Sequence, residues 1–253
     1  MIYYRDGKMQ EGELSVAPMQ PAFRTGYGFY ETIAWNRRTV CHLNLHLVRV
    51  MASLEEFCIT PDEVDYEKVL PEVVAANGLS DSFARINLFY PLENGRARTI
   101  VTADPFDYQP ERVWKMRIRD EIFLSEMMRH KTMSHMEYFI AWQQAVAEGA
   151  DDSVFCDPAG NILESSVSAL VFSRDGHFYE TETNYKLPST ALAVAAQHLK
   201  IERKVIPLSA AGDYEYVYAL NSLGGMIPVS ELGEYSYKLD FGTAAKITRL
   251  ILS

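Results

Sequence analysis

Residues 130–170 read H-K-T-M-S-H-M-E-Y-F-I-A-W-Q-Q-A-V-A-E-G-A-D-D-S-V-F-C-D-P-A-G-N-I-L-E-S-S-V-S-A-L, and this stretch decides the fold. Lys131 opens it, and Glu164 follows 33 residues later. Between them we expect a helix that Gly149 ends, a short strand at 153–156 and a type I turn at 157–160, where proline and glycine occupy their favoured places. The apolar stripe predicted for the buried face of that helix consists of Met136, Phe139, Ile140, Ala145 and Val146.

Composition and charge narrow the class of protein. A chain of 253 residues that is 48% hydrophobic can bury the core of one large domain or two small ones. The formal net charge of -10 argues against a nucleic-acid partner. Cys41, Cys58 and Cys156 lie far apart without metal-ligand spacing, so we expect no metal site and a reducing compartment. With no signal-peptide pattern and no apolar run near the roughly 20 residues of a membrane helix, we expect a cytoplasmic protein without a membrane partner.

The first hundred residues carry alternating strand and helix signals. Asp6-Gly7 predicts a hairpin. Gly26 and Gly28 permit a close approach of the backbone to another segment. From pattern alone, Arg49 is either a solvated arginine paired with Glu55 or Glu56, or an arginine whose guanidinium donates two hydrogen bonds to a phosphate. The expected elements are a strand over 29–35, helices over 43–57 and 66–77, and strands over 83–90 and 99–102.

Two prolines and three acids make residues 104–111 the best linker candidate. We therefore expect a small domain over 1–106, a linker over 107–112 and a larger domain over 113–253. The elements expected in the larger domain are a strand over 114–119, a hairpin of 169–172 with 178–181, a helix over 190–200 capped by Ser189, strands over 204–207 and 216–220, a glycine loop over 221–229 and a closing helix over 241–252.

Pattern alone predicts a two-part α+β protein and does not choose Lys131 among nine lysines. Without further information, Lys131 and Glu164 would be exposed side chains. Five dispersed motifs carry a resemblance: G-Y-G-F-Y-E-T-I (26–33), H-L-V-R-V (46–50), H-K-T (130–132), A-V-A-E-G-A-D-D-S-V-F-C-D-P-A-G-N-I-L-E (145–164) and N-S-L-G-G-M-I-P-V (221–229). In this order they are similar to the class IV (fold type IV) enzymes that depend on pyridoxal phosphate (PLP): branched-chain aminotransferases, D-amino acid aminotransferases and aminodeoxychorismate lyases.

The resemblance implies a small N-terminal α/β domain, a larger C-terminal β-barrel-like domain with helices, PLP as cofactor, and a homodimer. It implies that Lys131 carries PLP covalently and moves protons, that Glu164 contacts the pyridine nitrogen, and that Arg49 grips the phosphate. Tyr138 is an open candidate for a bond to the cofactor, because the tyrosine of the aminotransferases falls at Met136. The remaining expected phosphate ligands are Ser189, Thr190, Ser222 and the Gly224-Gly225 amides, and the candidate substrate-binding residues are Tyr30, Arg85, Arg96 and Arg98.

Three functions follow from the resemblance. The first is an aminotransferase acting on an amino acid of the branched-chain or D-amino acid type, with a keto acid as its second substrate. The second is an aminodeoxychorismate lyase that releases pyruvate and 4-aminobenzoate, which the compact length and Asn221-Ser222-Leu223 favour. The third is a PLP-binding protein with reduced or lost turnover. Two departures from the family suggest it, Ala169 in place of asparagine and L-P-S-T-A (187–191) in place of a glycine-isoleucine-threonine turn.

Overall fold

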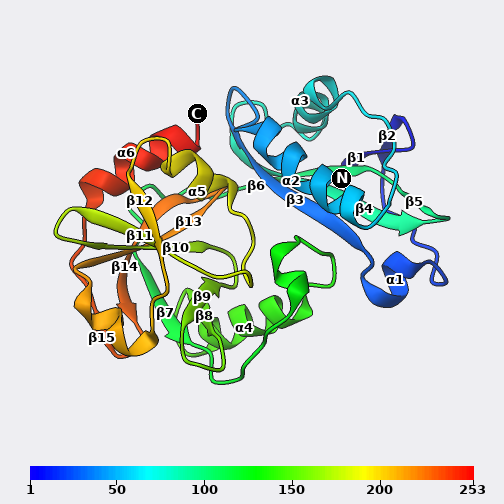
Figure 1. Cartoon of the computed structure of the whole chain (residues 1–253). Helices are drawn as coiled ribbons and strands as arrows, with labels where there is room; N and C mark the ends of the chain where they lie inside the picture. The colour runs from blue at the N-terminus through cyan, green and yellow to red at the C-terminus, as the bar shows by residue number, and fades with distance from the viewer. The chain divides into compact units, whose positions relative to one another are not determined.

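The computed structural model describes all 253 residues, which form two compact units (Figure 1). Unit 1 comprises Met1–Tyr108, His130–His135 and Leu252–Ser253, and unit 2 comprises Gln109–Arg129 and Met136–Ile251. The expected boundaries assign Lys131 to the C-terminal domain, whereas the contacts of residues 130–135 place it in unit 1. The physical reason is backbone pairing: the segment hydrogen-bonds to strand β3 (Gly28–Asn36).

Unit 1 is an antiparallel sheet with helices. The strands follow the order β2-β1-β6-β4-β3, and β5 pairs with β4. Side chains alternate along β3, so that Phe29, Ile33 and Trp35 enter a core to which helices α2 and α3 contribute. The other elements of this unit are β1 (Ile2–Arg5), β2 (Lys8–Glu11), α1 (Pro21–Thr25), α2 (Leu43–Glu56), α3 (Tyr66–Ala76), β4 (Phe83–Glu93), β5 (Arg96–Ala97) and β6 (Ile100–Pro105).

Unit 2 is built on a nine-stranded mixed sheet. The order is β12-β11-β10-β13-β14-β7-β8-β9, with β15 paired to β14. Its elements are β7 (Trp114–Ile118), η1 (Glu126–Arg129), α4 (Met136–Ala147), β8 (Asp152–Cys156), β9 (Ile162–Ser165), β10 (Ala169–Arg174), β11 (His177–Thr181), α5 (Thr190–Ala195), β12 (Ile201–Lys204), η2 (Leu208–Asp213), β13 (Tyr216–Asn221), β14 (Gly225–Leu232), β15 (Tyr235–Ser236) and α6 (Phe241–Ile251).

The sheet of unit 2 curls until its first and last strands approach each other. Ile162, which begins β9, donates its N–H to the carbonyl of Ile206 at 2.9 Å, and Asn161 forms a β-bridge with Pro207. Residues 206–207 follow one residue after the end of β12. The edge of the sheet is thereby covered, as closure of a barrel requires. The expectation of a β-barrel-like C-terminal half with helices is confirmed.

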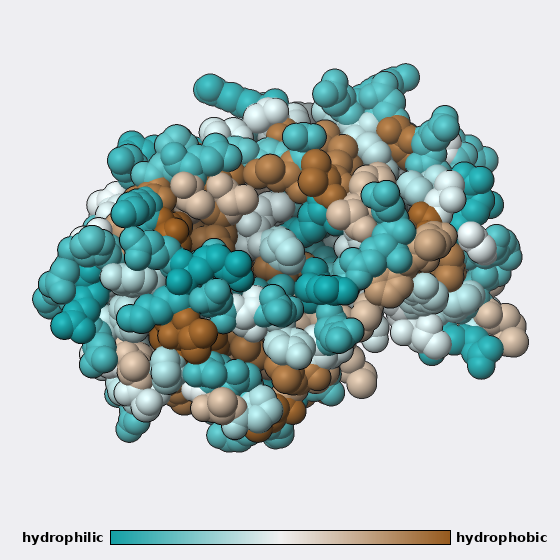
Figure 2. Space-filling view, viewed as in Figure 1, coloured by the Kyte–Doolittle hydropathy of each residue, from teal (hydrophilic) through white to brown (hydrophobic).

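The buried stripe predicted for α4 is correct at Ala145 and wrong at three of its five positions. Met136, Phe139 and Val146 have relative exposures of 69%, 53% and 50%, and the buried residues of the helix are Ala141 and Ala145. Two small side chains allow a close approach to β8, where the Ser153 hydroxyl donates to the carbonyl of Ala141 at 2.8 Å. The larger apolar side chains therefore face outward, and brown surface lies among teal at the place of α4 in the lower part of the view (Figures 1 and 2).

Two further predictions differ from the structure. The strand expected over 204–207 is β12 at Ile201–Lys204, which pairs in parallel with β11. The glycine loop expected over 221–229 is a tight turn, because β14 already begins at Gly225. No helix in the structure has both the length and the apolar character needed to cross a bilayer.

Candidate active site

The segment that carries Lys131 pairs with the edge strand β3 of unit 1. The N–H of Tyr30 donates to the carbonyl of Lys131, and the N–H of Met133 donates to the carbonyl of Gly28, both at 2.9 Å. Two glycines make room for this pairing. A Cβ on Gly28 would lie 2.8 Å from the sulfur of Met133, and one on Gly26 would lie 2.9 Å from the backbone of Ser134. The close approach expected at both glycines is therefore to the lysine segment.

Lys131 lies over an aromatic ring. Its Nζ is 4.4 Å from the ring centroid of Tyr30, a cation–π distance. The ring of His135 packs edge-on against the same tyrosine, with centroids 5.5 Å apart. Burial, reinforced by the charge of Lys131, lowers the pKa of His135 to about 3, so this imidazole is uncharged at neutral pH. Lys131 forms no ion pair within unit 1, which leaves its amine available for chemistry.

His130 anchors the segment. Its Nδ1 lies 3.0 Å from the hydroxyl of Ser53 on α2, and its ring packs edge-on against Phe57 at 5.1 Å. Phe29 of β3 packs on the other two rings. The residue before Lys131 is thus fixed by both a helix and a strand, which limits the movement of the lysine backbone.

Arg49 is held by a buried carboxylate. Glu31 on β3 has 0% exposure, and it accepts hydrogen bonds from Arg49 Nε at 2.8 Å and from Arg49 Nη2 at 2.5 Å. The Nδ1 of His46 lies 2.6 Å from the same carboxylate. Burial alone would raise the pKa of Glu31, but the hydrogen bonds from His46 and Arg49 outweigh it and hold the pKa below its ordinary value.

Sequence reasoning gave Glu31 no role, although it stands in the G-Y-G-F-Y-E-T-I motif. The available signal was its position: Phe29, Glu31 and Ile33 alternate toward the core, and an acid at such a position requires a partner. Burial lowers the pKa of His46, and the nearby positive charges of Arg49 and Lys131 lower it further. Glu31 raises this pKa, but its effect is the smaller one. A neutral His46 therefore donates to Glu31 while Arg49 balances the charge.

Glu164 lies on β9 of unit 2 with 6% exposure. The hydroxyl of Tyr138 donates to its Oε1 at 3.0 Å, and the backbone N–H of Leu187 donates to its Oε2 at 3.0 Å. Both donors are neutral, so they orient the carboxylate and leave its negative charge in place. Tyr138 was the open candidate for a hydrogen bond to the cofactor. In the structure it donates instead to Glu164, the carboxylate expected to contact the pyridine nitrogen.

A second carboxylate supports the turn after Glu164. Asp152 is fully buried and accepts hydrogen bonds from the hydroxyls of Ser165, at 2.6 Å, and Ser166, as well as from the N–H of Ser153, at 2.8 Å. Burial raises the pKa of Asp152 to about 6 against the opposing effect of these bonds. This network fixes residues 165–168 and hence the end of the strand that carries Glu164.

The residues expected around the phosphate lie in unit 2, with the exception of Arg49. The Ser189 hydroxyl accepts the N–H of Leu192 at 3.2 Å and so caps α5. Thr190 is buried at 7% exposure, and Ser222 is half-buried in the turn between β13 and β14. The Gly224 amide was expected to face the phosphate, but it donates to the side-chain oxygen of Asn221 at 2.7 Å, because the tight turn uses it internally.

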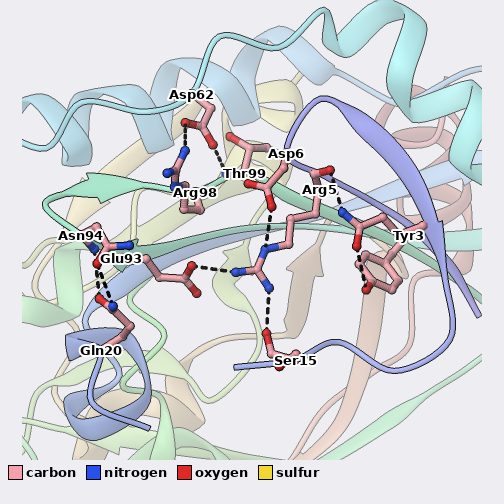
Figure 3. A network of polar contacts seen from close by, with 11 residues as sticks. Tyr3, Arg5, Asp6, Ser15, Gln20, Asp62, Glu93, Asn94, Arg98 and Thr99 are labelled. Carbon is pink, nitrogen blue, oxygen red and sulfur yellow. Dashed lines mark hydrogen bonds and ion pairs between the residues drawn. The ribbon is translucent and has the colours of Figure 1, made fainter. Parts of the chain in front are cut away.

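The residues expected to bind the substrate belong to unit 1. Tyr30 stacks on Phe89 with centroids 6.2 Å apart, and Arg85 lies on β4 opposite Ala34, two register pairs beyond Thr32–Asn87. Because side chains alternate along a strand, Tyr30 and Arg85 share one face of the sheet. Arg98 pairs with Asp62 at 3.3 Å (Figure 3), and Arg96 donates to the carbonyl of Pro61 at 3.3 Å. The roles of all four in substrate binding remain predictions.

Comparison with known proteins identifies the family. The model of the family described as amino-transferase class IV matches residues 28–232, which include four of the five motifs quoted above and all but the first two residues of the fifth, at 26–33. The chain belongs to the class IV aminotransferases. This confirms the enzyme class and, for the family, PLP as the cofactor. A search of curated proteins gives no significant match.

Several solved structures share the fold of this class IV enzyme. A branched-chain aminotransferase of Thermoproteus uzoniensis matches with TM-score 0.87 and 19% identity, over 100% of this chain and 95% of that chain. A Legionella pneumophila protein assigned as a 4-amino-4-deoxychorismate lyase matches with TM-score 0.84 and 19% identity, over 94% of this chain and 95% of that chain. The PLP-bound form of a hypothetical aminotransferase of Mycobacterium tuberculosis matches with TM-score 0.83 and 18% identity, over 99% of this chain and 98% of that chain. At these identities they confirm the expected fold type IV architecture.

Proposed function

We propose that this class IV enzyme is an aminotransferase that transfers the amino group of a small or branched amino acid to a keto acid, with Lys131 as its catalytic residue. The observation that carries the assignment of the site is the environment of Glu164. The two oxygens of this buried carboxylate accept hydrogen bonds from the Tyr138 hydroxyl and the Leu187 N–H, and neither of these neutral donors cancels the negative charge that would hold a protonated ring nitrogen. The chemistry of these groups fits PLP.

The roles of the residues follow from their chemistry. When bound, PLP supplies an electron sink for the negative charge that develops at the substrate Cα. Glu164 would accept a hydrogen bond from the pyridine N–H, and Arg49 would donate to the phosphate from a guanidinium whose plane Glu31 fixes. Lys131 Nζ would form the covalent link and later take the proton from Cα, a task supported by the absence of an ion pair within its unit.

The remaining phosphate contacts are proposed for Ser189, Thr190 and Ser222. Ser189 already caps α5, so its hydroxyl would share its bonding capacity with Leu192. Tyr30, beneath the Lys131 amine, would line the substrate pocket, and Arg85 on the same sheet face would meet a substrate carboxylate. Arg96 and Arg98 are proposed as secondary contacts. We further propose a homodimer, on the basis of the family resemblance, and a cytoplasmic location, on the basis of three widely spaced cysteines without metal-ligand spacing.

The central experiment is reduction of the PLP-loaded protein with borohydride, followed by peptide mapping. The label is expected on the peptide that contains Lys131, and Lys131→Ala should abolish both label and turnover. Lys186→Ala is the matched control, because Lys186 is also partly buried but is ion-paired with Glu180 at 2.6 Å. A label on any other lysine would overturn the assignment.

A half-reaction screen then separates the candidate activities. An aminotransferase should convert to its pyridoxamine form when a panel of L- and D-amino acids is added without a keto acid. Aminodeoxychorismate lyase activity, which the Asn221-Ser222-Leu223 turn favours, would instead release pyruvate from aminodeoxychorismate. A protein that holds PLP and gives neither response would be a binder with lost turnover. Either of these last outcomes would contradict the aminotransferase proposal.

A further inference from the structure

Tyr138 is connected to Glu164 by a hydrogen bond that the roles above do not use. Tyr138 lies in the first turn of α4, and its hydroxyl is 3.0 Å from Glu164 Oε1. The other oxygen is oriented by a backbone amide, that of Leu187. The hydroxyl of Tyr138 is therefore a side-chain donor that can be removed from this carboxylate without any change to the backbone.

The tyrosine is held in place by aromatic packing. Its ring lies 5.1 Å from Phe155 and 6.0 Å from Phe123, and Phe155 has 1% exposure. This group belongs to a cluster with Met128, Ala141 and Leu163 that lies between α4 and strands β8 and β9. A ring with two rotatable bonds in such a cluster presents its hydroxyl at one fixed position.

We propose that Tyr138 is a positioning residue, which fixes the direction of the Glu164 carboxylate and sets how strongly that carboxylate competes for the proton of the pyridine nitrogen. This inference rests on the proposed function. A hydrogen bond to a carboxylate favours its charged form and lowers its affinity for a proton. With the hydroxyl present, Glu164 would leave the proton on the ring nitrogen of bound PLP; without it, Glu164 would compete more strongly for that proton.

The test is Tyr138→Phe, which removes one oxygen atom and keeps the ring packing. The protein is loaded with PLP carrying ¹⁵N in the pyridine ring, and the nitrogen signal is recorded by NMR. We expect the signal of the variant to move toward that of an unprotonated nitrogen, and kcat to fall about tenfold with KM nearly unchanged, since a hydrogen bond to a charged group contributes roughly that factor.

Tyr185→Phe is the matched control, because Tyr185 packs on the same cluster and its hydroxyl does not bond Glu164. It should leave the nitrogen signal and kcat unchanged. A second comparison uses the Glu164→Gln background. If Tyr138 acts through Glu164, adding Tyr138→Phe there should change kcat by less than twofold. This comparison remains informative if the single variant holds PLP poorly.

The outcomes distinguish this inference from the proposed function. If Tyr138→Phe gives the wild-type nitrogen signal and wild-type kcat while borohydride still labels Lys131, the positioning role is overturned and the proposed function stands. If the wild-type nitrogen is unprotonated, or if the label lies elsewhere, the proposed function itself fails. A tenfold loss of kcat in both backgrounds would also overturn the inference, because Tyr138 would then act independently of Glu164.

Discussion

Replacement of Glu31 by glutamine tests the buried network that holds Arg49. Glutamine has nearly the same shape, but it carries no charge and offers one acceptor oxygen where Arg49 and His46 require two. The change removes the negative charge that Glu31 places beside a guanidinium of 11% exposure. Removal of one partner from a buried ion pair costs about 3–5 kcal/mol. For a chain of this size each kcal/mol lowers Tm by roughly 2–4 °C, so we expect a decrease of about 6–20 °C.

The assay is thermal unfolding of the cofactor-free protein, followed by circular dichroism at pH 7.5. Glu231→Gln is the control, because Glu231 forms an exposed pair with Lys115 at 2.7 Å and such pairs contribute little. A Glu31→Gln variant that unfolds within about 2 °C of the wild type would refute the conclusion that the network stabilises unit 1.

The pH dependence gives the same prediction a second test. The pKa of Glu31 is lowered in the folded protein, so the unfolded chain binds its proton at a higher pH than the folded chain does. The stability that Glu31 contributes is therefore complete above its unfolded value of roughly 4.3 and is lost as the pH falls through the folded value. The difference in Tm between wild type and Glu31→Gln should narrow below pH 4, and a difference that widens there would contradict this account.

Two other substitutions test the surroundings of the site. Gly28→Ala places a Cβ 2.5 Å from the carbonyl oxygen of Tyr90, so we expect the free energy of unfolding in a urea titration to fall by about 1–3 kcal/mol and the borohydride labelling of Lys131 to weaken. Gly176→Ala is the control: its φ of +76° strains an alanine as well, but no atom lies within 4 Å of the added Cβ and the turn belongs to unit 2, so the labelling should stay intact. Asp152 has its pKa raised to about 6, so its stabilising contribution is complete below pH 4 and is lost as the pH rises through 6. Between pH 4 and pH 7.5, the free energy of unfolding of Asp152→Asn should therefore rise by about 3 kcal/mol relative to that of the wild type. Urea midpoints of the two proteins that change in parallel with pH would contradict this.

Local signals in the sequence were sufficient for most elements of the fold. The hairpin at Asp6-Gly7, the helix over residues 43–56 and the type I turn at residues 157–160 depend on spacing and turn chemistry within a few residues, and the structure has each of them. Local signals failed at α4. Helical periodicity marks an apolar face, but whether Phe139 or Ala141 is buried depends on how closely β8 packs against the helix.

The sequence by itself determined the family, through Lys131, Glu164 and the run of residues between them. Only the tertiary structure decided what surrounds those residues: the pairing of the lysine segment with β3, the bond from Tyr138 to Glu164, and the enclosure of Glu31 by His46 and Arg49. The partners in these contacts come from different elements and are separated by 15 to 26 residues in the two side-chain networks. No periodicity within one element encodes such a pair, because the hydrogen bond exists only after both elements have packed.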